Sequence, residues 1–200
     1  MGLIAALGIA MALVPSGCLA YTHDDSVAIT VNVSNAVSVN IENTAFELTG
    51  SHALNDDFVV AQGEAISIDN DSGSGAAGIV ETYSLSATID AAGAEWDTIA
   101  TGGSPSENTV AVLAVFSGDG TAAPDSAEFN AADDYLTNSA RAASTSVYYG
   151  PTSDAAQDGL SVAPEANRER NLWLRVRMPT SSTAAKTSFV ITLYISASAG

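Results

Sequence analysis

The sequence predicts an all-β protein whose fold is an Ig-like or jelly-roll-like antiparallel β-sandwich with long acidic loops. Apolar residues alternate with polar ones in many short segments, which is the pattern of strands with one buried face. Clusters of Gly, Asp, Asn and Ser separate these segments, as expected for turns. Roughly ten short strands with almost no helix are typical of a sandwich or a barrel.

The N-terminal segment is expected to be a signal peptide. Residues 1–14 are apolar, and Pro15 ends the run. This run is shorter than a comfortable membrane span. Cys18 and Ala20 are small residues at the positions that signal peptidase recognises. We therefore expect residues 1–20 to be removed.

Cleavage after Ala20 would leave a single domain, residues 21–200, outside the cell or on its surface. No Lys or Arg precedes the apolar run, although signal peptides usually carry one, so two alternatives stay open. Cys18 is a candidate for lipidation, and the whole segment would be retained in a pilin-like protein. A cleaved chain contains no cysteine, so core packing and assembly must replace disulfides.

The clearest alternation lies just after the expected cleavage site. It places Val or Ile at every second position, at Val27, Ile29, Val31 and Val33, and again at Val37, Val39 and Ile41. This pattern predicts one long strand with a bulge, or two strands separated at Asn35. Further strands are expected in residues 46–48, 58–61, 65–68 and 82–89.

The second half of the chain begins with residues 110–116, which are apolar on both faces and predict a buried strand. An elaborated loop region follows over residues 118–166, with a short helix expected within 124–136 and a strand within 144–149. Residues 172–178 and 189–195 alternate again and predict a C-terminal hairpin.

The charge is strongly negative and unevenly distributed. The chain has 23 acidic and 6 basic residues, for a formal charge of −17. Residues 21–140 contain no Lys or Arg, and every basic residue lies at or after Arg141. Phosphate groups and anionic lipids require a positive surface, so we expect no binding to nucleic acid or to an anionic membrane surface.

Residues typical of catalysis are scarce, and no catalytic residue is predicted. The chain has two histidines, His23 and His52, and no nucleophile elbow motif. Neighbouring carboxylates are plentiful, but chance supplies such pairs in any acidic protein, and few aromatic residues accompany them to form a sugar-binding cleft. We expect a protein that is not an enzyme.

Calcium is the one cofactor to which the sequence points. Asp69 and Asp71 lie two residues apart in an Asp-Asn-Asp-Ser-Gly stretch, as oxygen ligands do in calcium loops. The alternative is an ordinary polar turn, because the downstream Glu of an EF-hand is missing. Glycans are possible partners, since aromatic side chains stack on sugars; the candidates are Trp96, Tyr148, Tyr149 and Trp173.

The layout resembles subunits of bacterial and archaeal surface fibres. The similar features are the alternating segment 27–41 after the leader, the abundance of Ala, Ser and Thr, and the alternating last segment 189–195. The resemblance implies a β-sandwich with few disulfides whose sheet is completed by a neighbour's terminal strand. Val27, Ile29, Val31 and Val33 would then form an assembly interface between copies.

The basic C-terminal segment is a second expected interface. Arg168 and Arg170 are expected in a polar loop. Arg175 and Arg177 share a strand face with Trp173, which suggests a stacked, partly exposed patch. A mostly acidic body with a basic segment suits head-to-tail contacts, so we expect these residues to serve assembly rather than folding.

The sequence therefore favours an extracellular structural protein that forms a homopolymer, as the subunit of a filament, a sheath or an S-layer. A secreted carbohydrate- or cell-binding module is the alternative. A secreted hydrolase and a pilin-like protein remain as less favoured readings.

Overall fold

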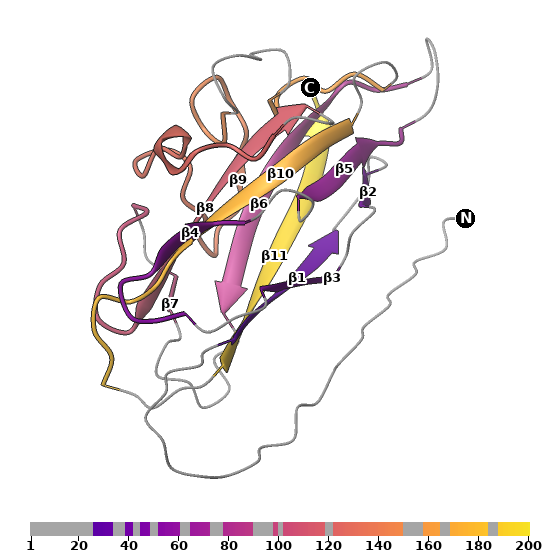
Figure 1. The fold of residues 1–200 in the computed structure, drawn as a ribbon. Helices are drawn as coiled ribbons and strands as arrows, with labels where there is room; N and C mark the ends of the chain where they lie inside the picture. Colours follow the sequence, from indigo (N-terminus) through magenta and orange to yellow (C-terminus); the bar gives the residue numbers. More distant parts are fainter. Residues whose placement is uncertain are drawn as a thin grey trace.

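The computed structural model describes the following residues, on which every statement below rests: 26–33, 39–41, 45–48, 52–60, 65–72, 78–89, 98–99, 102–118, 122–149, 158–164, 169–183 and 188–200. The expected signal peptide, His23, Trp96 and Arg168 lie outside them. The described residues form an all-β sandwich (Figure 1), as the sequence predicts.

One layer is a five-stranded sheet in the order β3-β1-β11-β6-β9. Its strands are β1 (Ser26–Val33), β3 (Ala45–Leu48), β6 (Glu81–Ile89), β9 (Arg141–Ala142) and β11 (Ser188–Ala199). β6 and β11 are antiparallel over nine residue pairs, from Ile89 opposite Ile191 to Glu81 opposite Ala199. β1 departs from the expected antiparallel arrangement, because it runs parallel to β11.

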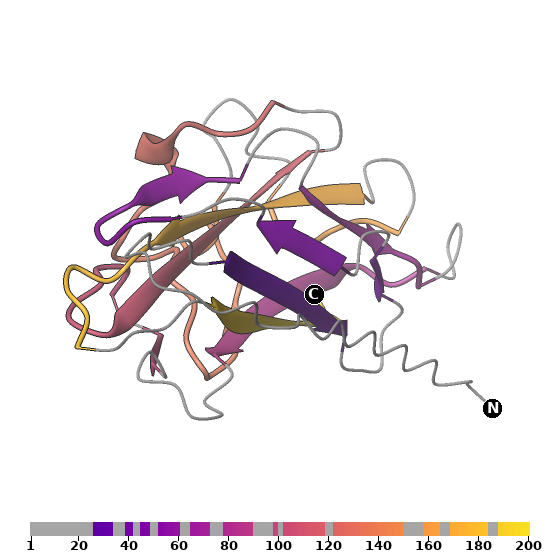
Figure 2. The same cartoon turned by 60° about the horizontal axis from the view of Figure 1, so that its bottom comes forward.

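The second layer is a six-stranded sheet in the order β2-β5-β10-β8-β7, with β4 paired to β10. Its strands are β2 (Val39–Ile41), β4 (Asp57–Val59), β5 (Ile66–Asn70), β7 (Thr98–Ile99), β8 (Thr109–Gly118) and β10 (Glu169–Arg177). β7 lies parallel to β8, and the other pairs are antiparallel. Figure 2 shows β10 and β11 in separate layers.

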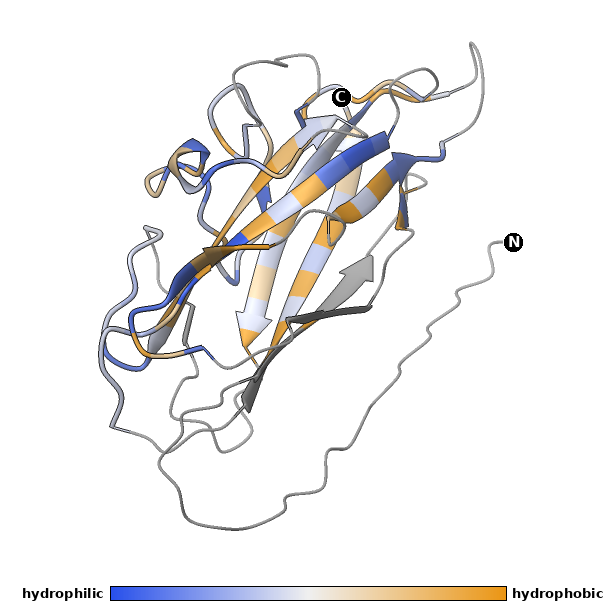
Figure 3. Cartoon of the chain, in the orientation of Figure 1, coloured by the Kyte–Doolittle hydropathy of each residue, from blue (hydrophilic) through white to orange (hydrophobic). Residues whose placement is uncertain are grey.

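The main core fills the space between the layers. Alternating strands turn every second side chain inward, so β6 buries Tyr83, Leu85 and Ala87 against Leu172 and Leu174 of β10. Figure 3 shows this alternation as apolar and pale bands along the strands. Full burial of one such side chain contributes about 1.5–3 kcal/mol before ordering costs.

A second core lies on the outer side of the six-stranded sheet. Leu113 and Val115 of β8 point there, where they pack with Trp173 and Phe129. β8 is therefore buried on both faces, as its continuous apolar sequence predicts. Phe129 belongs to the long segment after β8, so part of the elaborated loop region covers this sheet.

The C-terminal hairpin predicted from the sequence is wrong. β10 and β11 belong to different sheets, and the chain between them crosses from one layer to the other. The inward side chains Leu174 and Leu193 share one core, so the two apolar faces meet across the sandwich. Alternation shows that each strand has one buried face, and it is compatible with either arrangement.

Three local predictions are also corrected or narrowed. The first alternating segment forms two strands, β1 and β2, which lie in different sheets, as the two-strand alternative predicts. The expected helix is a single 3-10 turn, Ser126–Glu128. The strand expected at residues 144–149 is absent from the described residues, where the two-residue strand Arg141–Ala142 precedes a series of bends.

Candidate assembly interface

β1 lies inside the sheet of its own chain. Eight residues of β1 pair with β11, from Ser26 opposite Ser188 to Val33 opposite Ile195. Four residues also pair with β3, so both edges of β1 are occupied. Ile29 is buried, with 2% of its surface exposed, which agrees with its expected place on the apolar face. The side chains of Val27, Val31 and Val33 lie outside the description.

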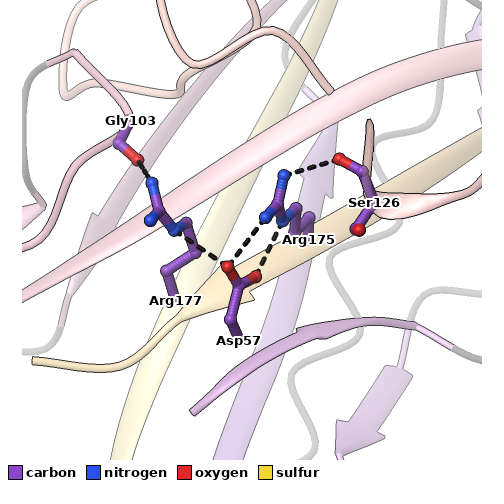
Figure 4. A network of polar contacts seen from close by, with 5 residues as sticks. All are labelled: Asp57, Gly103, Ser126, Arg175 and Arg177. Carbon is purple, nitrogen blue, oxygen red and sulfur yellow. Dashed lines mark hydrogen bonds and ion pairs between the residues drawn. The ribbon is translucent and has the colours of Figure 1, made fainter. Parts of the chain in front are cut away.

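Arg175 and Arg177 form a polar network on the outer face of β10 (Figure 4). Nε and Nη2 of Arg175 donate to the two carboxylate oxygens of Asp57 at 2.7 Å each, and its Nη1 donates to the Ser126 carbonyl at 2.6 Å. Nε of Arg177 lies 3.2 Å from Asp57 Oδ2, and its Nη1 donates to the Gly103 carbonyl at 2.7 Å.

This network joins segments that are distant in the sequence. Asp57 begins β4, Ser126 begins the 3-10 turn, and Gly103 lies in the loop before β8. Hydrogen bonds from Arg175 lower the pKa of Asp57, and the charges of both arginines add to this effect. One carboxylate between two guanidinium groups leaves a local charge of about +1 in an acidic protein. The arginines thus serve the fold, and their expected role in assembly stays a prediction.

Trp173 is not part of an exposed patch, and this expectation is wrong. Only 1% of its surface is exposed, because Phe129 and the side chains of β8 cover it. Its indole Nε1 donates to the Ser117 hydroxyl at 2.8 Å. The alternation predicts correctly that Trp173 faces away from the main core, but the sequence carries no signal that another segment covers this face.

Arg170 is also misplaced by the sequence prediction. It lies in β10 rather than in a polar loop, and 3% of its surface is exposed. Its Nε donates to the Asp158 carbonyl at 2.8 Å, and its Nη1 donates to the Glu169 carbonyl at 2.9 Å. In β10 it shares the inward phase of Leu172, so it lies at one end of the sandwich interior.

A buried polar cluster surrounds that end of the sandwich, and the sequence offers no pattern that reveals it. Glu81, Tyr83 and Asn70 are fully buried there. Asn70 Nδ2 donates to the carbonyls of Ile79 and Val162 at 2.9 and 2.8 Å. Burial raises the pKa of Tyr83, and the charge of Glu81 raises it further while Arg170 opposes them.

Asp69 and Asp71 do not lie in one open loop. Asp69 is a buried residue of β5, opposite Glu169, whereas Asp71 lies beyond the strand and is exposed. Between them, Asn70 Oδ1 accepts a hydrogen bond from the Ser72 amide at 3.1 Å, which closes a short turn. Among the described residues, no group of three His, Cys, Asp or Glu side chains could hold a metal ion.

The aromatic residues considered for sugar stacking are partly removed from solvent. Tyr148 is fully buried and Tyr149 is half-buried, so neither Tyr148 nor Trp173 offers an open ring face. His52 stacks on Phe58, with ring centroids 3.9 Å apart, and its Nδ1 lies 3.7 Å from Asp56. These contacts account for His52 as a packing residue.

Asp134 is the residue that fastens the long segment after β8, and sequence reasoning missed it. Its two carboxylate oxygens accept the amides of Asn130 and Tyr148, each at 2.7 Å. Its own carbonyl accepts the Ala114 amide of β8 at 2.9 Å. Burial raises the pKa of Asp134 to about 6. A lone Asp in a loop is too common for its sequence to signal such a role.

No known family model, curated protein or solved structure matches the chain. No helix in the described residues has the length and apolar character that a membrane crossing requires. Function must therefore be argued from the strand edges and faces of the sandwich.

Proposed function

We propose that the chain is a non-enzymatic extracellular structural protein that assembles with copies of itself into a surface filament, sheath or S-layer. The observation that supports this most directly is the position of β1. Among the described strands it is the first, yet it lies beside β11, the last, in a parallel register of eight residues. No short connection holds these two strands together.

A strand in this position is suited to exchange between copies. The β1 strand of a neighbour can enter the same slot and make the same backbone hydrogen bonds to β11 and β3. Ile29 of the donor would take the same buried position in the core. Joining copies in this way needs no disulfide, which fits a chain that has one cysteine in its N-terminal segment.

Electron microscopy of the purified, secreted protein tests the assembly. Filaments or ordered layers are expected, and isolated monomers at every salt and calcium concentration would contradict the proposal.

Deletion of residues 21–33 tests strand exchange. Exchange predicts a folded, soluble monomer that recovers stability when a peptide of residues 26–33 is added. A peptide carrying Ile29→Asp is the matched control, because a charge in place of Ile29 cannot be buried. A deletion variant that stays unfolded with either peptide would show that β1 serves only its own domain.

A further inference from the structure

The outer side of the five-stranded sheet carries a continuous set of uncharged hydroxyl residues. Opposite pairs on β6 and β11 are Thr88 with Thr192, Ser86 with Tyr194, Ser84 with Ser196 and Thr82 with Ser198. The inward neighbours on β6 and the inward residues Ile191, Leu193 and Ile195 on β11 are buried, whereas these eight are half-buried or exposed, so they share the outer side. We call these eight residues the hydroxyl face. None of them is charged.

Two exposed apolar side chains lie on the same outer side, one near the middle of the hydroxyl face and one at its end. Among the described residues, the exposed large hydrophobic side chains are Ile79, Val80 and Tyr194. Tyr194 lies in the face itself, with 37% of its surface exposed. Val80 precedes β6 in the same phase as Thr82, and its carbonyl accepts the Gly200 amide at 2.8 Å. An apolar anchor within a polar surround is typical of a binding surface.

The chemistry of the face favours a second copy of this chain. Two molecules that each carry a formal charge of −17 repel each other, and an uncharged face is where they approach at the lowest electrostatic cost. A hydroxyl group both donates and accepts hydrogen bonds. A face of Ser and Thr can therefore pair with an identical face, which a face of carboxylates cannot do.

The size of the sheet is adequate for such a contact. Its longest shared stretch is the nine-residue pairing of β6 with β11 within five strands. Nine residues span about 30 Å and the two paired strands about 10 Å, so the hydroxyl face covers about 300 Å². Stable interfaces bury about 800 Å² per partner. The hydroxyl face therefore supplies the centre of such a contact, and the flanking strands β1 and β9 supply the rest of its area.

We propose that the hydroxyl face packs against the hydroxyl face of a second copy, as a two-fold lateral contact. The inference builds on the proposed function, because β1 would join copies end to end while this face joins neighbouring filaments side by side. Tyr194 lies near the middle of the β6–β11 pairing, opposite Ser86. Because the contact is two-fold, a charge introduced there would bury two like charges, one from each copy.

The test compares the full-length protein with two variants by analytical ultracentrifugation and electron microscopy. Ser86→Asp places a charge in the hydroxyl face. Ser104→Asp is the matched control, since Ser104 is exposed in the loop before β8 of the opposite sheet. We expect wild type and the control to associate equally, and Ser86→Asp to weaken the lateral contact at least tenfold. Association of wild type should strengthen from 0.05 to 0.5 M NaCl, because salt screens the repulsion.

The outcomes separate the two proposals. Single filaments of Ser86→Asp beside bundled wild-type filaments support both. Salt-dependent dimers that Ser86→Asp abolishes, without filaments, support the lateral contact and contradict the filament. Equal association of Ser86→Asp and wild type overturns the lateral contact, whether or not filaments form. Wild-type monomers that bind insoluble polysaccharide or ice, when Ser86→Asp does not, also overturn the lateral contact and assign the hydroxyl face to another partner.

Discussion

The outer faces of the two sheets differ in how much of the chain packs on them. On the outer side of the six-stranded sheet, Phe129 packs against Trp173, and the Ser126 carbonyl of the 3-10 turn accepts a hydrogen bond from Arg175. Beyond the five-stranded sheet, the described residues leave the hydroxyl face half-buried or exposed. One outer face forms a second core, and the other remains a surface.

The difference between the two faces follows from the side chains that they carry. A tryptophan and two arginines need partners when they leave water, and Asp57, Ser117 and the loop carbonyls provide them. Small hydroxyl side chains at the surface stay hydrated, so no other segment has to pack on them. We therefore expect changes on the covered face to affect folding and changes on the hydroxyl face to affect association.

The largest expected effect is that of Trp173→Ala on the covered face. It would lower the free energy of unfolding by about 3–5 kcal/mol, because it leaves a cavity under Phe129 and removes the partner of the Ser117 hydroxyl. Urea denaturation measures the change. Trp173→Phe is the control, because it keeps a ring but loses the indole donor, and a smaller loss is expected. Equal stability of wild type and Trp173→Ala would show that this face is not a core.

The second prediction concerns the pH dependence that Asp134 brings to the attachment of the segment after β8. Burial raises its pKa from 3.8 to about 6, so the folded protein holds the proton more tightly than the unfolded chain. Its contribution to stability is greatest below about pH 4 and falls as the pH rises through 6, by about 3 kcal/mol in total.

Asp134→Asn is the appropriate comparison, because its side chain stays neutral at every pH. Stability of wild type relative to this variant should fall between pH 4 and pH 7, as measured by denaturation at each pH. The other carboxylates titrate in both proteins and largely cancel. A difference that stays constant over this range would contradict the raised pKa.

A smaller loss is expected from Asp57→Asn, which removes the carboxylate between Arg175 and Arg177. We expect about 1–2 kcal/mol at pH 7, since the group is partly exposed and water screens the pair. The sign with pH is opposite to that of Asp134. The arginines lower the pKa of Asp57, so its stabilisation is present above about pH 4 and is lost as the pH falls further. Thermal unfolding at pH 7 and pH 3 tests both statements.

The smallest effect on folding is expected on the hydroxyl face. Tyr194→Ala should change the free energy of unfolding by about 0.5 kcal/mol or less, because the side chain is exposed and touches water. Denaturation of the monomer at low concentration measures this. A loss comparable to that of Trp173→Ala would mean that part of the chain covers Tyr194, and the contrast between the two faces would disappear.

Several parts of the candidate interface were accessible from the sequence and others were not. The strand at 26–33 and the phase of Ile29 follow from the period of two along an extended chain. The network around Asp57 does not, because its residues come from β4, β10 and two loops that only the fold brings together. The hydroxyl face lies between these cases, since each Ser and Thr position is predictable while their alignment depends on the β6–β11 register.

The sequence by itself determined that the chain is a sandwich, and which side chains of β6, β8 and β11 leave water, because burial on one face imposes alternation. The tertiary structure decided which strands are neighbours. β10 and β11 could have formed a hairpin, since each presents the same kind of apolar face. Their separation into two layers depends on contacts between residues far apart in the chain, which no local pattern encodes.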